Sequence, residues 1–284
     1  MFLARIILVT LLIITKSESA RILALFPTPS ISHQVVFRPL TQELAKRGHE
    51  VIVLTTDPAF PKGKSPENLY EIDFHDLSYN TLKEFYSIAT GNKGDLMHQV
   101  KNVFTKNAKV IEKQLLSEEM QNMMNNKNIT FDLLIIELFS RAALSYSHVY
   151  KVPVIQISSF GGLTETFESM GVPSHPNLHP STARQKILNI SVWENMLELY
   201  FCRSIFNVVI DMENVENEML KKVVDPNIPP ISELRKNVHM LLLNIDPVWD
   251  FNRPVTKNVV HINGIHHKPK NELTKVLLNL EQSS

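Results

Sequence analysis

Two short apolar segments near the start of the chain constrain the fold more than any other feature. They are RILALF at residues 21–26 and EVIVLTT at residues 50–56, and an amphipathic stretch that ends at Arg47 separates them. Segments rich in Ile, Leu and Val on both faces are typical of parallel strands buried inside a sheet. Parallel neighbours joined through a helix form a right-handed crossover. The opening of the chain therefore predicts a βαβ unit and an α/β fold.

The sequence indicates where the helix between these strands ends but not where it begins. Gly48 suits the left-handed position that follows a helix, and Lys46 and Arg47 complement the negative end of the helix dipole. Pro39 either begins the regular helix or kinks it. The sequence leaves that boundary open.

The same alternation of strands and helices continues along the chain. We expect a short strand at 70–74 and a helix from Val100 whose apolar stripe is formed by Phe104, Ala108, Ile111 and Leu115. The other expected elements are strands at 131–139, 152–160, 239–244 and 258–264 and helices at 141–151 and 194–224. Residues 161–191 are rich in Pro, Gly, Ser and His and form a connection long enough to be either functional or disordered. The pattern predicts a Rossmann-like, doubly wound parallel sheet.

Residues 1–20 have the composition of a secretory signal peptide. Arg5 precedes an apolar run over residues 6–14, and small residues stand at Ser19 and Ala20. We expect cleavage after one of these two residues. The alternative is an uncleaved signal anchor, which the run disfavours because a span needs about 20 apolar residues.

Beyond the signal peptide we expect one globular domain over residues 21–265 and the start of a linker at residues 266–284, where the chain stops. Asn128 and Asn189 each begin an N-glycosylation triplet, as suits a chain in the lumen of the secretory pathway. Cys202 is the only cysteine and lies in an apolar helical pattern, which predicts a thiol packed in the core.

Charge and residue spacing exclude several function classes. Lys plus Arg equal Asp plus Glu at 29 each, so no net field draws the chain to nucleic acid or to an anionic membrane. The histidines show no metal-ligand spacing, and one cysteine cannot build a thiolate zinc site. No serine lies in a G-x-S-x-G context. Arg203 interrupts the most apolar late stretch, residues 196–210, so no further membrane span is expected.

The first strand-to-helix turn is where open α/β sheets bind ligands. Here it is PTPSISHQ, which has none of the glycines of a phosphate-binding loop. It carries His33 near the N-terminus of the following helix, and the positive end of the helix dipole favours the neutral imidazole that a general base requires. His33 is therefore a candidate general base. The alternative is a solvated loop histidine, one of eleven histidines in the chain.

A base histidine needs a partner that fixes its tautomer and stabilises the charge it gains. Glu137 closes the apolar segment FDLLIIE, which places it at the carboxyl end of a neighbouring strand and within reach of His33. The alternative is a strand-end cap without a chemical role.

The residues around His33 also resemble a known family. The block RILALFPTPSISHQVVFRPLTQELAKRGHEVIVLTTDPAF is similar to the start of mature animal UDP-glycosyltransferases, the UDP-glucuronosyltransferase-like family, and to the insect members in particular. The resemblance continues through FDLLIIELF, PVIQISS and VVHINGIHHKP, so it covers essentially the whole chain from Arg21.

The resemblance implies a fold and a reaction. In that family two Rossmann-like domains face each other in a GT-B fold. The histidine matching His33 deprotonates an acceptor hydroxyl for in-line attack on the anomeric carbon of a UDP-sugar, with inversion and loss of UDP. The partner of that histidine is usually an aspartate, and the matching residue here is Glu137, one methylene longer.

The resemblance also assigns the substrates and their places. The acceptor is a small lipophilic compound whose pocket involves Ser32, Phe160 and Gly161, with the loop that follows. The co-substrate is UDP-glucose or UDP-glucuronic acid, and the family holds it mainly through a C-terminal domain that this chain lacks, so no donor-binding residue is assigned here. Full-length members are anchored in the membrane of the endoplasmic reticulum, and association with them is expected.

Three functional hypotheses follow. The first is the acceptor-binding half of an enzyme that conjugates a hexose to a small hydroxyl compound. The second is a catalytically inactive, truncated protein that binds acceptors or modulates a partner. The third is an unrelated secreted ligand-binding domain, which leaves the match to the family unexplained.

Overall fold

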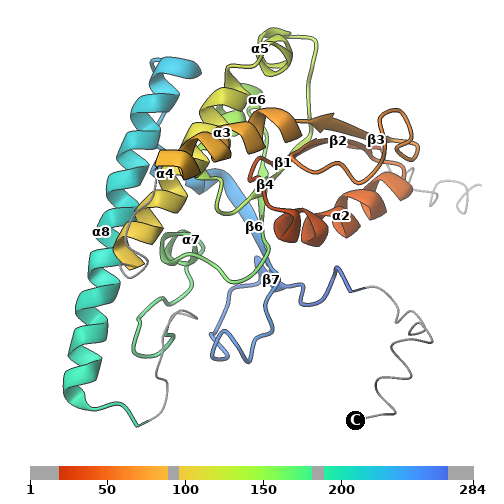
Figure 1. Cartoon of the computed structure of the whole chain (residues 1–284). Helices are drawn as coiled ribbons and strands as arrows, with labels where there is room; N and C mark the ends of the chain where they lie inside the picture. Colours follow the sequence, from red (N-terminus) through yellow and green to blue (C-terminus); the bar gives the residue numbers. More distant parts are fainter. Residues whose placement is uncertain (1–18, 89–95, 181–188, 268–284) are drawn as a thin grey trace, which may run out of the picture.

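A computed structural model describes residues 19–88, 96–180 and 189–267 (Figure 1). Residues 1–18 of the predicted signal peptide and most of the predicted linker lie outside these ranges. Within them, seven strands form one sheet in the order β3-β2-β1-β4-β5-β6-β7, and every neighbouring pair is parallel. The strands are β1 (Arg21–Phe26), β2 (Glu50–Thr55), β3 (Leu69–Asp73), β4 (Leu133–Glu137), β5 (Val154–Ser158), β6 (Val238–Leu243) and β7 (Val259–His261). The predicted α/β class with a parallel sheet is confirmed.

Helices cover both faces of this sheet (Figure 1). They are α2 (Ile31–Lys46), α3 (His75–Ile88), α4 (Leu96–Leu115), α5 (Glu118–Asn125), α6 (Ser145–Tyr150), α7 (Thr164–Ser169), α8 (Val192–Val223) and α9 (Ile231–Leu234), with 3-10 turns η1 (Arg141–Leu144) and η2 (Arg235–Asn237). Helix α2 lies on one face, whereas α4, α5, α6 and α8 contribute side chains to the core on the other. The sheet is therefore doubly wound, as predicted.

Strand β1 shows why the sequence favours this arrangement. Leu23 and Leu25 point into the core shared with α4 and α5, and Ile22, Ala24 and Phe26 point into the core beneath α2. All five side chains are buried. A strand that is apolar on both faces is stable only when both faces are covered, because an exposed apolar face would lose the favourable free energy of removing it from water.

The strand order reverses direction beside β1. The chain proceeds from β1 outward to β2 and β3, and then returns to place β4 on the other side of β1. The connections leaving the carboxyl ends of β1 and β4 therefore diverge to opposite faces, the arrangement at which open α/β sheets bind ligands. His33 follows β1 and Glu137 ends β4, so both predicted site residues lie at this switch point.

The ends of α2 settle the boundary that the sequence left open. Pro39 lies inside a continuous helix that begins at Ile31, so it neither starts nor breaks the element. Gly48 has a φ of 92°, in the left-handed region predicted for it.

Two predictions about helices are corrected by the packing. In α4 the buried positions between Phe104 and Ile111 are Asn107 and Val110, and Ala108 is only half-buried. Helical spacing in the sequence does not fix which of two adjacent residues is buried, because that depends on the element packed against the helix. The predicted irregular stretch 161–191 contains a short helix, α7, which packs its Phe167 against β6 and β7.

The prediction for Cys202 was wrong. Its side chain is half-buried, because it lies in the N-terminal half of the long helix α8. The buried residues of α8 are confined to its second half, between Val209 and Leu220, where it packs beside α4. Among the helices in the described ranges, none combines the length and the hydropathy that crossing a bilayer requires.

Candidate active site

The turn between β1 and α2 takes its shape from one buried side chain. Gln34 donates through Nε2 to the carbonyl oxygens of Phe26, at 2.9 Å, and Thr28, at 3.1 Å, and its Oε1 accepts from the Thr55 hydroxyl at 2.8 Å. Ser30 occupies the N-cap position of α2 without a side-chain capping bond. The turn is thus held by a glutamine from the first turn of its own helix, and this places His33 above the carboxyl edge of the sheet.

His33 and Glu137 lie in contact across the switch point. The Nδ1 atom of His33 forms a short hydrogen bond with Oε1 of Glu137, and the Glu137 side chain is fully buried while that of His33 is 17 % exposed. Because Nδ1 faces the carboxylate, Nε2 is the ring nitrogen available to a ligand, and no described residue forms a hydrogen bond with it. A carboxylate on Nδ1 with a partly exposed Nε2 is the arrangement of a general-base histidine.

Aromatic rings surround the imidazole. The His33 ring centroid is 5.5 Å from that of Phe160, 6.3 Å from that of Phe139 and 6.5 Å from that of Phe37, all in edge-to-face geometry. Phe139 and Phe160 also pack against each other at 4.7 Å. Phe160 is 48 % exposed, so the apolar wall continues from His33 to the surface. This wall is suited to a ligand with an apolar body and one polar group directed at Nε2.

The other predicted acceptor residues border this wall to different degrees. Gly161 follows Phe160, and its carbonyl oxygen accepts a hydrogen bond of 2.8 Å from Ser158 at the end of β5. Ser32 immediately precedes His33 in α2, but its exposed hydroxyl is bonded to that of Ser30 at 2.9 Å. The structure thus brings Phe160 against His33 and leaves Ser32 on the outer side of the turn.

The two predicted glycosylation sites are exposed. Asn128 lies in the connection between α5 and β4, and Asn189 lies just before α8. Across the described ranges no three His, Cys, Asp or Glu side chains gather closely enough to hold a metal ion.

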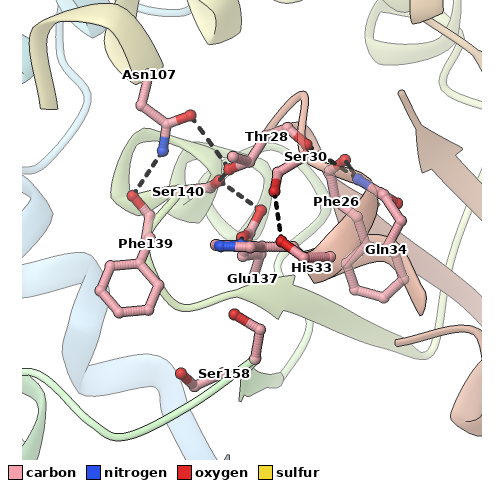
Figure 2. A network of polar contacts seen from close by, with 12 residues as sticks. Phe26, Thr28, Ser30, His33, Gln34, Asn107, Glu137, Phe139, Ser140 and Ser158 are labelled. Atoms are coloured by element: carbon pink, nitrogen blue, oxygen red, sulfur yellow. Dashed lines mark hydrogen bonds and ion pairs between the residues drawn. The ribbon is translucent and has the colours of Figure 1, made fainter. Parts of the chain in front are cut away.

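Sequence reasoning missed the polar residues behind the dyad. Asn107 from α4 donates to the carbonyl oxygen of Phe139 at 2.9 Å, and the Ser140 hydroxyl donates to Oε2 of Glu137 at 3.2 Å (Figure 2). Thr28 lies between them (Figure 2). The available signal was Asn107 itself, a polar residue within the apolar stripe of an amphipathic helix.

A buried group of five charges adjoins the turn after β4. Arg141 Nη2 is 3.1 Å from Glu216, Arg141 Nη1 is 3.8 Å from both Glu165 and Glu213, and Arg235 pairs with Glu213. Three carboxylates thus face two guanidinium groups. Burial raises the pKa of Glu165, and it raises the pKa of Glu216 to about 7. The group joins α7 and α8 to the turn that carries Phe139 and Ser140.

The fold indicates the class of protein. The fold is similar to that in the crystal structure of the glycotransferase of kitacinnamycin, which superposes with a TM-score of 0.50 at 13 % identity over 91 % of this chain and 54 % of that one. The class is therefore an α/β domain of the GT-B glycosyltransferase type.

The family follows from the sequence comparisons. Residues 21–284 match the family described as UDP-glucoronosyl and UDP-glucosyl transferase, and the chain belongs to that family. An ecdysteroid UDP-glucosyltransferase of Spodoptera littoralis nuclear polyhedrosis virus is 33 % identical over 275 residues, which are 93 % of this chain and 53 % of the viral protein. UDP-glucosyltransferase 2 of Dactylopius coccus is 29 % identical over 264 residues, 90 % of this chain and 49 % of that protein.

These matches confirm the resemblance to insect-type UDP-glycosyltransferases. They also show that the chain spans about half the length of the curated relatives it matches.

Proposed function

We propose that residues 21–265 form the acceptor-binding domain of a UDP-glycosyltransferase in which His33 is the general base and Glu137 is its partner. The observation that carries the proposal is the contact between Nδ1 of His33 and the buried carboxylate of Glu137 at the switch point of the sheet. Membership of the family supports the use of a UDP-sugar as co-substrate.

The proposed reaction is a single displacement. Nε2 of His33 takes the proton from an acceptor hydroxyl while the oxygen attacks the anomeric carbon of the sugar. The bond from that carbon to the UDP oxygen breaks, and UDP leaves with the electron pair. One displacement inverts the anomeric centre. Glu137 stabilises the imidazolium that forms and holds the tautomer that leaves Nε2 free to accept.

The substrate classes are proposed from the chemistry of the residues around His33. The rings of Phe37, Phe139 and Phe160 favour a small lipophilic acceptor with one hydroxyl directed at His33. The turn after β1 offers no glycine-rich loop for a diphosphate, so we place the UDP-sugar, with glucose or glucuronic acid as the hexose, mainly on groups outside the described residues.

The proposed location is the lumen of the endoplasmic reticulum. The pattern of residues 1–20 and the exposed positions of Asn128 and Asn189 support it. There the protein would meet full-length members of its own family, which are the proposed protein partners.

The test of the base is His33→Ala in a fusion that supplies the remaining length of a viral relative. We expect kcat to fall by roughly 10²- to 10⁴-fold, the usual effect of losing acid–base catalysis. His239→Ala is the matched control, because His239 is exposed at the opposite end of a strand and bonds only to a backbone oxygen nearby. A His33→Ala enzyme that turns over as fast as this control would overturn the proposal.

A further inference from the structure

The carboxylate of Glu137 has a second oxygen, which has a hydrogen-bond partner of its own. We propose that Ser140, Thr28 and Asn107 are positioning residues that hold Glu137, and through it His33, in the orientation the base requires. The inference rests on the proposed function of the dyad. The side-chain hydrogen bonds of these three residues are to Glu137, to Phe139 and to one another, so each acts on His33 through Glu137 or through the turn that follows it.

Ser140 makes the direct contact. Glu137 is fully buried, Oε1 is bonded to His33, and Oε2 accepts from the Ser140 hydroxyl at 3.2 Å. No other described side chain bonds to this carboxylate. A buried carboxylate with two partners depends strongly on each of them, because an oxygen left without a donor is poorly solvated in the interior. Ser140 therefore fixes the rotation of the carboxyl group about its last torsion.

Asn107 holds the turn that presents Ser140. Its Nδ2 donates to the carbonyl oxygen of Phe139 at 2.9 Å (Figure 2). The backbone N–H of Ser140 donates to the carbonyl oxygen of Glu137 at 3.1 Å, which closes the turn. Asn107 is buried in α4, a helix that carries none of the three phenylalanines around His33. The same bond fixes the backbone that carries the Phe139 ring, which packs against both His33 and Phe160. One helix thus restrains the carboxylate and the aromatic wall together.

Thr28 lies between Asn107 and Ser140. Its Oγ1 donates to Oδ1 of Asn107 at 3.2 Å, and it lies 3.1 Å from Oγ of Ser140. The amide oxygen of Asn107 only accepts, so the Thr28 hydrogen goes there, and the Ser140 hydrogen goes to the carboxylate of Glu137. Thr28 therefore couples Asn107 to the carboxylate, and it stands in the turn that Gln34 holds at the end of β1.

The test uses spectroscopy on the full chain labelled with 15N-histidine. A hydrogen bond between an imidazole and a carboxylate gives a far-downfield proton resonance, which His33→Ala assigns by removing it. We expect Ser140→Ala and Thr28→Val to shift or broaden this resonance. Thr41→Val and Ser147→Ala are the matched controls, because both residues are buried and each hydroxyl bonds only to the backbone carbonyl three residues earlier in the chain. We expect both controls to leave the resonance unchanged.

Turnover in the fusion described above provides the second readout. We expect Ser140→Ala to lower kcat by about 10- to 100-fold, the usual effect of a misplaced catalytic group, with little change in the acceptor KM. Asn107→Leu should lower kcat and also raise the acceptor KM, since it releases Phe139. Thr28→Val is nearly isosteric and tests the network if Asn107→Leu fails to fold.

The outcomes separate this inference from the proposed function. If His33→Ala is inactive while Ser140→Ala and Thr28→Val match their controls in both resonance and kcat, the positioning role is wrong and the dyad stands. If His33→Ala retains its turnover, the proposed base is wrong, whatever the resonance shows. A resonance that moves in Ser140→Ala and not in Ser147→Ala, together with the fall in kcat, supports both.

Discussion

Replacement of Glu216 tests whether the buried charge group makes the protein less stable as the pH rises. Burial raises the pKa of Glu216 from 4.5 to about 7 in the folded chain. The folded state therefore holds a proton that the unfolded state releases between these two values. The stabilisation is complete below pH 4.5 and is lost as the pH rises through about 7. At about 1.4 kcal/mol for each pH unit, the loss amounts to at most about 3 kcal/mol.

Glu216→Gln removes this proton exchange and keeps the shape of the side chain. It also leaves two carboxylates, Glu165 and Glu213, facing the guanidinium groups of Arg141 and Arg235. We expect the free energy of unfolding of the wild type to fall by about 1 to 3 kcal/mol more than that of the variant between pH 5 and pH 8. A part of the slope should persist in the variant, because burial also raises the pKa of Glu165.

The assay is urea unfolding followed by circular dichroism at several pH values, with the midpoint and the slope m fitted at each. Glu218→Gln is the control, since Glu218 lies in the same helix but is exposed and pairs with Lys221, which lowers its pKa. This control should keep the decrease in stability with pH. If Glu216→Gln and Glu218→Gln follow the same pH dependence, the reasoning about the charge group is refuted.

The remaining predictions concern the site, the backbone and the isolated chain. Glu137→Gln should lower kcat more than it changes the acceptor KM, and a change in KM alone would indicate a pocket residue. Gly48→Ala should lower the stability by about 1 to 2 kcal/mol, because its φ of 92° strains any residue with a Cβ while no neighbour lies within 4 Å. An unchanged melting temperature would contradict this. Residues 21–284 expressed alone should bind a simple phenol weakly and transfer no glucose to it, and micromolar binding of UDP-glucose in calorimetry would oppose the placement of the donor. Asn128→Gln and Asn189→Gln should each remove one glycan when the chain is made in a secretory cell, as read from its mobility after glycosidase treatment.

The family resemblance and the sheet were accessible from the sequence because they depend on local patterns. A run apolar on both faces, as in residues 21–26, is stable only as an inner parallel strand. Gly48 marks the end of α2 because few other residues adopt its backbone conformation. His33 and Glu137 could be predicted to lie near each other because the carboxyl ends of parallel strands share one edge, where His33 follows one strand and Glu137 ends another.

What surrounds the dyad was decided by tertiary structure. An amphipathic stripe specifies which side of α4 is buried but not what it packs against, so nothing local linked Asn107 to Phe139. The half-buried state of Cys202 has the same cause, since an apolar helix is covered only where another element reaches it. Local sequence thus determined the parallel strands and the C-terminal end of α2, whereas the start of α2 and the helix α7 came from the structure. The contacts of Asn107, Ser140 and Thr28 behind Glu137 depended on how elements distant in the chain pack together, because side-chain hydrogen bonds of a few ångströms are fixed only by that packing.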